Sequence, residues 1–196
     1  MNLPNKLTIS RIILTFVFMF FLFSKGVPAK ALALFTFLLA SFTDALDGLI
    51  AKNTNQVTDF GRLMDPVADK VLVLAAFLAF VEMELIPAWM VVIIIFREIA
   101  ITGLRMSALA KNKIIPSDEG GKHKMVSQVF VIFAVLLFLI FREAGIKVFK
   151  FWNDRTEAIY KDTIFLSMLV TTVLTLISGI SYLVKNKGVY LNAKAG

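Results

Sequence analysis

The sequence predicts an all-α, polytopic membrane protein with six transmembrane helices and a polar cavity that faces the cytoplasm. Of its 196 residues, 58% are hydrophobic and only 18% are charged. The mean hydropathy is +0.80, which is typical of a chain that lies in lipid. A bilayer span needs about 20 mostly apolar residues, and six stretches of that kind follow one another. No linker or repeat divides them, so we expect one domain over residues 1–196.

The six predicted spans are separated by short or polar connections. In chain order they cover about residues 7–24, 29–51, 62–83, 86–110, 123–141 and 162–184. The first opens with the polar stretch LPNKLTISR, which we expect at the membrane interface before the chain turns inward. The last contains SMLVTTVLTLISGISYLV, whose Ser, Thr and Gly residues suit close contacts between helices. The connections at 111–122 and 142–161 are long and polar.

Lysine and arginine residues determine the predicted orientation. Ten of them fall on one side of the spans: Lys6, Arg11, Lys52, Arg62, Lys111, Lys113, Lys122, Lys124, Lys185 and Lys187. Glu82 and Glu84 fall on the other side. Because positively charged loops stay in the cytoplasm, both termini are predicted to be cytoplasmic. One conflict remains, since the segment 142–161 carries five cations on the predicted outer side.

The rest of the composition excludes several classes of function. The sequence has no cysteine, which excludes disulfides, thiolate nucleophiles and cysteine-based metal sites. The net charge of +7 is interpreted as cytoplasmic loops in contact with anionic lipid headgroups, rather than as a surface for nucleic acid.

Five of the fourteen acidic residues lie in one segment, DALDGLIAKNTNQVTDFGRLMDPVADK, at residues 44–70. On helices of about 100° per residue four of them form two stripes with small residues: Asp44 and Asp47 with Gly48 and Ala51, then Gly61 with Asp65 and Asp69. Two helices joined by a short connection are expected to be antiparallel neighbours, so the stripes can face each other across a cavity. Asp59 is interpreted as a solvated loop acid.

These four aspartates are costly to hold in an apolar setting without a cation. One ionisable group at mid-membrane costs roughly 2.5–3.5 kcal/mol, so four unpaired carboxylates would cost on the order of 10 kcal/mol, comparable with the stability of a domain. A site made only of oxygen ligands suits Mg²⁺, Mn²⁺ or Ca²⁺. Two divalent ions about 4 Å apart would balance the four charges and form a clamp for phosphoryl chemistry. The residues therefore predict a membrane-embedded site for two metal ions.

The spacing of these residues also resembles a known family. Read as D-x2-D-G-x2-A-K-x8-G-x3-D-x3-D, the pattern is formed by Asp44, Asp47, Gly48, Ala51, Lys52, Gly61, Asp65 and Asp69. It resembles the motif of the CDP-alcohol phosphotransferase family, which has arginine where this chain has Lys52. Lysine keeps the positive charge but lacks the bidentate fork of arginine on phosphate.

The resemblance extends over most of the chain and is closest to one bacterial branch of that family. LPNKLTISRIIL at the start, DPVADK, FREIAITGLR at 96–105 and GKHK at 121–124 are similar to that branch. It implies six transmembrane helices, a homodimer in the bacterial inner (cytoplasmic) membrane, and an active site open to the cytoplasm and the lipid leaflet. It also implies transfer of a phosphatidyl group from CDP-diacylglycerol to sn-glycerol 3-phosphate, with release of CMP.

Site residues follow from the resemblance position by position. It implies that Asp44, Asp47, Asp65 and Asp69 bind two divalent cations, Mg²⁺ or Mn²⁺, and that Asp69 is also the general base for the acceptor hydroxyl. The residues implied to border the nucleotide are Gly48, Ala51, Lys52 and Gly61, with Asn5, Thr8 and Arg11 from the first span. For those last three, a simple interfacial role is the alternative.

The acceptor phosphate is expected to bind basic residues near the cytoplasmic side. Arg97 lies within the fourth span, and Arg105 is two turns further, about 80° round the same helix. Lys122 and Lys124 begin the fifth span, and such a cluster suits a phosphomonoester. The alternatives are a structural ion pair of Arg97 with Glu98 or an aspartate, and a purely topological role for the two lysines. His123 is interpreted as interfacial.

Two other functions remain open on the sequence alone. The same chemistry with serine, inositol phosphate or another alcohol as acceptor would use the same aspartates. A divalent-cation transporter would use the aspartates as a transport site. Against the transporter, the acids cluster near one end of their spans, and the glycines and Lys52 have no evident role in it.

Overall fold

The computed structural model describes the backbone of residues 3–54, 59–110, 119–147 and 152–187, and the side chains of residues 9–43, 70–108, 124–146 and 152–187. All regular structure in these ranges is helical. The six helices are α1 (Leu3–Phe23), α2 (Val27–Thr54), α3 (Asp59–Glu82), α4 (Ala88–Ala110), α5 (Glu119–Lys147) and α6 (Asp154–Lys185). Each overlaps one predicted span, which confirms the all-α class.

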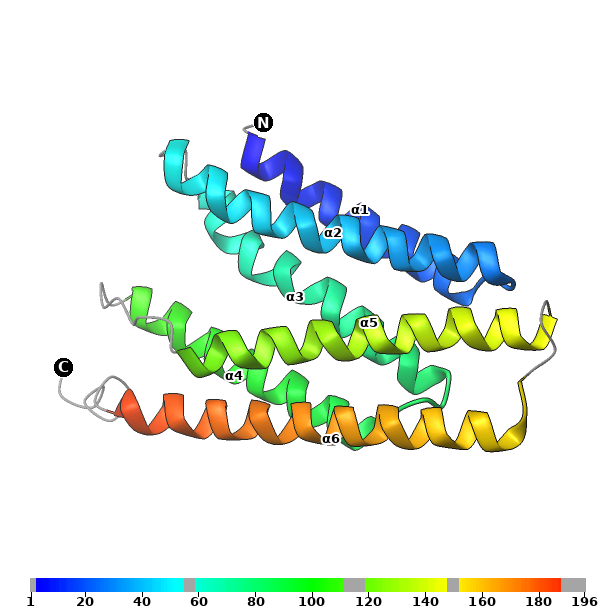
Figure 1. Ribbon diagram of the computed structural model, residues 1–196. Coiled ribbons are helices and arrows are strands. Elements are labelled where there is room, and N and C mark those ends of the chain that lie inside the picture. The colour runs from blue at the N-terminus through cyan, green and yellow to red at the C-terminus, as the bar shows by residue number, and fades with distance from the viewer. Residues whose placement is uncertain (1–2, 55–58, 111–118, 148–151, 188–196) are drawn as a thin grey trace.

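The helices lie side by side along one common direction (Figure 1). α1 packs against both α2 and α3, while α5 contacts α2, α3 and α6, and α4 packs mainly on α6. The start of α1 and the end of α6 lie at the same end of the bundle (Figure 1). The connections from α2 to α3 and from α4 to α5 are at this end too. We call it the 44–70 end, because the acidic segment lies there.

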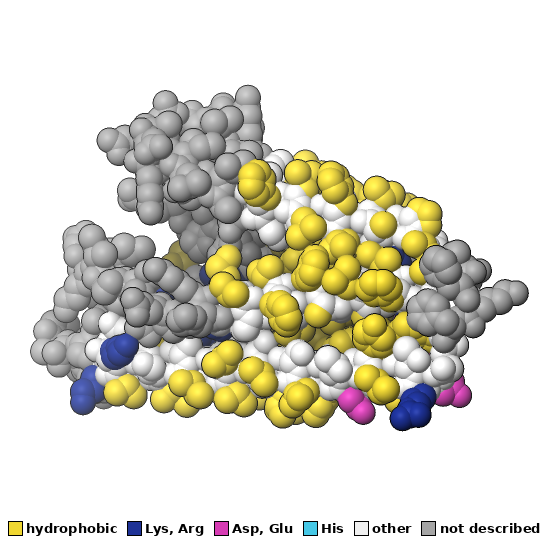
Figure 2. Space-filling view, in the orientation of Figure 1, with side chains coloured by type: hydrophobic (Ala, Val, Ile, Leu, Met, Phe, Trp, Pro, Cys, Tyr) yellow, Lys and Arg dark blue, Asp and Glu magenta, His cyan; other side chains and the backbone are white. Residues whose placement is uncertain are grey.

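Apolar side chains fill the bundle away from the 44–70 end. The largest fully buried ones include Phe18, Phe37, Phe77, Phe80, Phe138, Leu22, Met90, Ile94, Ile132 and Leu136. On the outside, hydrophobic side chains are exposed along the whole described part of the face shown in Figure 2. A helix bundle that is apolar both inside and outside is typical of a membrane protein.

Within the described residues, two helical stretches are long and apolar enough to cross a bilayer, Lys124–Ile146 and Asp154–Lys185. Ile9–Phe23 and Val27–Thr43 are shorter apolar helices. The coarse expectation of apolar membrane helices is therefore supported at these positions, and the full count of six transmembrane helices stays a prediction.

The segment 142–161 departs from the expected boundaries. α5 continues to Lys147 and α6 already begins at Asp154, so much of this polar connection is helical. The side chain of Asn153 caps α6 by accepting a hydrogen bond from the Thr156 amide at 2.9 Å. Asp154 and Glu157 lie in the first turn, where negative charge is favoured by the helix dipole. Hydropathy marks the apolar part of a helix but not its capped polar end.

Charges in the same segment are paired across the two helices. The Glu157 carboxylate contacts Arg142 at 3.2 Å and Lys161 at 3.1 Å. The indole of Trp152 donates a hydrogen bond to Glu157 at 3.2 Å and stacks on Tyr160. Two of the five cations that conflict with the predicted orientation are thus held in an acid-containing cluster beside aromatic rings.

Candidate active site

The four aspartates predicted to bind metal all lie on helices. Asp44 and Asp47 are in the second half of α2, and Asp65 and Asp69 are in the first half of α3. Their side chains lie outside the described ones, so their role as metal ligands stays a prediction. Among the side chains that are described, no group of three or more acids or histidines forms a metal site.

The residues expected around the nucleotide lie near the same end. Gly48, Ala51 and Lys52 are on α2, Gly61 is on α3, and Asn5 and Thr8 are on α1; their side chains also lie outside the described part. Arg11 is described, and only 3% of it is exposed. Arg11 is thus buried among the helices, on α1, which packs on both α2 and α3, and its role at the nucleotide stays a prediction.

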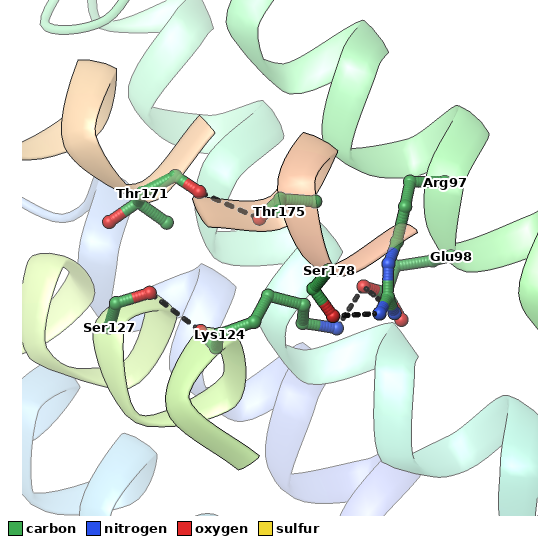
Figure 3. A network of polar contacts seen from close by, with 7 residues as sticks. All are labelled: Arg97, Glu98, Lys124, Ser127, Thr171, Thr175 and Ser178. Carbon is green, nitrogen blue, oxygen red and sulfur yellow. Dashed lines mark hydrogen bonds and ion pairs between the residues drawn. The ribbon is translucent and has the colours of Figure 1, made fainter. Parts of the chain in front are cut away.

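Three buried charges meet between α4 and α5. The Lys124 ammonium donates a hydrogen bond to Glu98 Oε1, and Nη1 of Arg97 lies 3.5 Å from the same oxygen. The side chains of Arg97, Glu98 and Lys124 are each at most 10% exposed. Figure 3 shows these side chains converging from the two helices. The structure thus joins Arg97 and Lys124, two residues predicted for the acceptor phosphate, through one carboxylate.

Helix α6 supplies partners for both arginines of α4. Nη2 of Arg97 donates a hydrogen bond to Ser178 Oγ at 2.8 Å (Figure 3). Nε of Arg105 donates to the Tyr182 hydroxyl at 3.2 Å, and its guanidinium lies 5.3 Å from the centre of the Tyr182 ring. The sequence does not single out Ser178 and Tyr182 as site residues. Their spacing of four residues places them on one face of α6, but this pattern also suits helix packing alone.

Arg105 is near enough to Arg97 for the two positive charges to repel each other. We call Arg97, Arg105, Lys124 and Glu98 the basic cluster. Its three positive charges and one negative charge leave a formal +2. A phosphate monoester carries about −1.5 to −2 near pH 7. The site therefore has the charge and the donors to bind a phosphorylated small molecule, and Glu98 limits the repulsion between the cations.

The basic cluster is also close to the acidic segment. Lys70, which directly follows Asp69 on α3, is near enough to Lys124 for the two ammonium groups to repel each other. α3 and α5 are in contact as well. The basic cluster therefore lies next to α3, the helix that carries Asp69. Lys122 and His123 lie in the first turns of α5, and their side chains lie outside the described part.

Removing the negative charge of Glu98 is expected to destabilise the fold. In Glu98→Gln the two cations lose their shared counter-charge, and breaking a buried ion pair costs roughly 3–5 kcal/mol. The midpoint of thermal unfolding in detergent should fall clearly below that of the wild type. Glu82→Gln, at an exposed position at the end of α3, is the control and should leave the midpoint unchanged. Equal midpoints for the two variants would contradict a structural role of the Glu98 charge.

Comparison with known proteins identifies the class. The family model described as CDP-alcohol phosphatidyltransferase matches residues 1–195. The chain belongs to this family, which confirms the resemblance found in the motif of residues 44–69.

Three relatives within this family are similar to the chain over most of its length. The chain is 40% identical over 148 residues to the CDP-diacylglycerol–glycerol-3-phosphate 3-phosphatidyltransferase of Bacillus subtilis, covering 69% of this chain and 77% of that protein. It is 32% identical over 182 residues to the protein of the same name from Rickettsia typhi, covering 92% and 94%. It is 37% identical over 134 residues to a probable phosphatidylglycerophosphate synthase of Mycobacterium tuberculosis, covering 67% and 64%.

Proposed function

We propose that this protein is a membrane phosphatidyltransferase that moves the phosphatidyl group of CDP-diacylglycerol to sn-glycerol 3-phosphate, giving phosphatidylglycerophosphate and CMP. Family membership and the names of the relatives support the reaction. The observation that carries the choice of acceptor is the buried basic cluster beside α3. Serine carries no phosphate and would not use the net positive charge of this cluster.

The acceptor is held by its phosphate in this proposal. Arg97, Arg105 and Lys124 bind the phosphate of glycerol 3-phosphate, with Lys122 near the mouth of the site. Charge-assisted hydrogen bonds from guanidinium groups are strong and directional, so they fix one end of a small, flexible molecule. In this proposal the primary hydroxyl at the other end faces the acidic segment, since Asp69 directly precedes Lys70 on α3 and the charge of Lys70 acts on Lys124.

The aspartates fit divalent cations by the chemistry of their donor set. Four carboxylates on two adjoining helices, in a sequence without cysteine, suit Mg²⁺ or Mn²⁺, and the family generally depends on divalent cations. Asp44, Asp47, Asp65 and Asp69 would hold them. When bound, the ions supply charge neutralisation at the pyrophosphate of the donor.

The proposed transfer is an in-line displacement at phosphorus, with Asp69 as the proton acceptor. Asp69 accepts the proton of the acceptor hydroxyl while the hydroxyl oxygen attacks the β-phosphorus of CDP-diacylglycerol in line. The new phosphorus–oxygen bond forms while the bond from that phosphorus to the bridging oxygen breaks, and CMP leaves. Lys52 contacts a phosphate of the nucleotide, and Arg11, Asn5 and Thr8 border it. Gly48, Ala51 and Gly61 leave room for the nucleotide to approach the backbone.

The membrane arrangement is part of the same proposal. All six helices cross the cytoplasmic membrane of a bacterium, with both termini and the 44–70 end on the cytoplasmic side, where the water-soluble acceptor is available. The basic residues near that end support this orientation. The proposed unit is a homodimer, as the family resemblance implies.

The experiment that tests the proposal is release of CMP by purified protein in detergent with CDP-diacylglycerol. Glycerol 3-phosphate, serine and inositol phosphate are offered separately, each with Mg²⁺, Mn²⁺ or a chelator. Turnover with glycerol 3-phosphate alone, and only with metal, is expected. Turnover with serine would overturn the assignment of the basic cluster, and turnover with inositol phosphate would overturn the choice of glycerol 3-phosphate. Metal uptake into vesicles without any CMP release would favour transport instead.

A further inference from the structure

One short part of α6, residues 178–182, contacts both arginines that point from α4 into the basic cluster. Ser178 accepts a hydrogen bond from Arg97, and Tyr182 accepts one from Arg105. α4 and α6 run in the same direction (Figure 1), so the two pairs follow one another along the interface. Both partners are buried, with Tyr182 only 2% exposed. The arginines are thus held from outside their own helix.

Ser178 differs from Thr172 and Thr175, two other buried hydroxyl residues of α6. Thr172 donates to the Met168 carbonyl at 2.8 Å and Thr175 to the Thr171 carbonyl at 2.7 Å. Such bonds to the preceding turn are the usual way in which a hydroxyl is satisfied in an apolar helix. Ser178, by contrast, bonds to a guanidinium on another helix (Figure 3). Helix packing alone does not require that contact.

Gly179 leaves the space that Arg97 occupies. A Cβ built on Gly179 would lie 2.9 Å from Cγ of Arg97 and 3.6 Å from its Nε. The first distance is too short for two carbon atoms, so Arg97 would have to move away. Arg97 lies against bare backbone here, with one hydroxyl and one carboxylate at its tip. Its side chain is therefore fixed along its length by Gly179 and at its end by Ser178.

Tyr182 holds Arg105 in two ways. Its hydroxyl accepts the Nε–H bond, and its ring lies under the guanidinium within the range of a cation–π contact, which is about 6 Å. Together these contacts orient the guanidinium.

We propose that Ser178, Gly179 and Tyr182 are positioning residues that fix the guanidinium groups of Arg97 and Arg105 for the phosphate of the acceptor. This inference rests on the proposed function of the two arginines. A free arginine side chain has about 2 kcal/mol of rotamer entropy to lose. Prior fixing of the side chain lowers the cost of binding a small anion. α6 thus sets the affinity for the phosphorylated acceptor without contributing a charge to it.

Gly179→Ala is the main test, with Gly103→Ala as its matched control. A Cβ on Gly103, on the exposed side of α4, would meet nothing within 4 Å among the described residues. In Gly179→Ala the KM for glycerol 3-phosphate should rise roughly 10- to 100-fold, as for a misplaced binding group. The KM for CDP-diacylglycerol should change less than about twofold. Gly103→Ala should leave both values near those of the wild type.

Conservative variants at the two partners give a second test should Gly179→Ala fail to fold. Ser178→Ala should raise the KM for glycerol 3-phosphate, and Ser178→Thr, which keeps the hydroxyl, should restore most of the loss. Tyr182→Phe keeps the ring and should have a smaller effect than Tyr182→Leu. Equal KM values for Gly179→Ala and Gly103→Ala would overturn the inference. So would a parallel rise in the KM of both substrates, which indicates a general packing defect.

A binding measurement separates this inference from the proposed function. Inorganic phosphate should raise the melting temperatures of the wild type and of Gly103→Ala. The rise should be much smaller for Gly179→Ala. If the wild type released no CMP with glycerol 3-phosphate, the proposed function would fail. The phosphate measurement would still decide the positioning role: equal protection of all three proteins rejects it, and selective loss in Gly179→Ala supports it.

Discussion

Asp69→Asn is expected to abolish CMP release while leaving the helical fold intact. Asparagine has nearly the same shape, but it cannot accept the proton of the acceptor hydroxyl and it carries no negative charge for a divalent cation. Loss of a general base alone costs about 10²- to 10⁴-fold in rate, and loss of a metal ligand adds to this. The initial rate of CMP release with saturating CDP-diacylglycerol and glycerol 3-phosphate measures the effect.

Asp59→Asn is the matched control for that variant. Asp59 is the first residue of α3 and lies outside both acidic stripes, so its replacement should leave the rate within about twofold of the wild type, as for a surface change. An Asp69→Asn protein that retains a tenth or more of the wild-type rate would remove Asp69 from its role as general base. Equal losses in both variants would point to a general effect on the acidic segment.

Arg97→Ala is expected to lower kcat/KM for glycerol 3-phosphate by about 100-fold or more. Each hydrogen bond to a charged group contributes about 1.5–3 kcal/mol, and about 1.4 kcal/mol is a factor of ten. Most of the loss should lie in the KM for glycerol 3-phosphate and little in the KM for CDP-diacylglycerol. Arg97→Lys should recover part of the activity, because lysine keeps the charge but not the planar fork.

Arg155→Ala is the control for Arg97. Arg155 is exposed near the start of α6, at the end of the bundle away from residues 44–70, so the kinetics should not change. The melting temperature of each variant is measured alongside, since Arg97 also contacts Glu98 and Ser178. A folded Arg97→Ala protein with an unchanged KM for glycerol 3-phosphate would show that Arg97 is structural only.

The sequence was sufficient for the helices and for the family. Apolar stretches of about 20 residues predicted all six helices, because span length is a physical requirement of the bilayer. The spacing of the motif at residues 44–69 predicted that Asp44, Asp47, Asp65 and Asp69 lie on two successive helices, and the structure confirms this. Their function as metal ligands depends on side-chain geometry and stays a prediction.

Contacts between helices that are far apart in the chain could not be predicted from the sequence. Arg97 and Ser178 are 81 residues apart, and Arg105 and Tyr182 are 77 apart. The period of a helix shows which residues share a face, but not which face of another helix packs against it. The sequence suggests Glu98 as a partner of Arg97. In the structure, the Glu98 carboxylate lies closer to Lys124 on α5 than to Arg97.

The early start of α6 was also missed, for a different reason. Residues 154–161 are polar and were assigned to the connection, although Asn153 followed by Asp154 and Glu157 is a typical helix start. Hydropathy alone places the start of the helix at the first apolar residues, whereas the capping residues place it at Asp154. Helices that project beyond the apolar layer need to be identified from their caps rather than from their hydrophobicity.

The most direct test of the central claim is to follow the acceptor itself into lipid. Purified protein is incubated with CDP-diacylglycerol, Mg²⁺ and glycerol 3-phosphate labelled in its glycerol carbons. Label is expected to enter the lipid extract as phosphatidylglycerophosphate, with one labelled molecule for each CMP released, and a chelator is expected to stop both. CMP released without label in the lipid would mean hydrolysis rather than transfer, and would contradict the account.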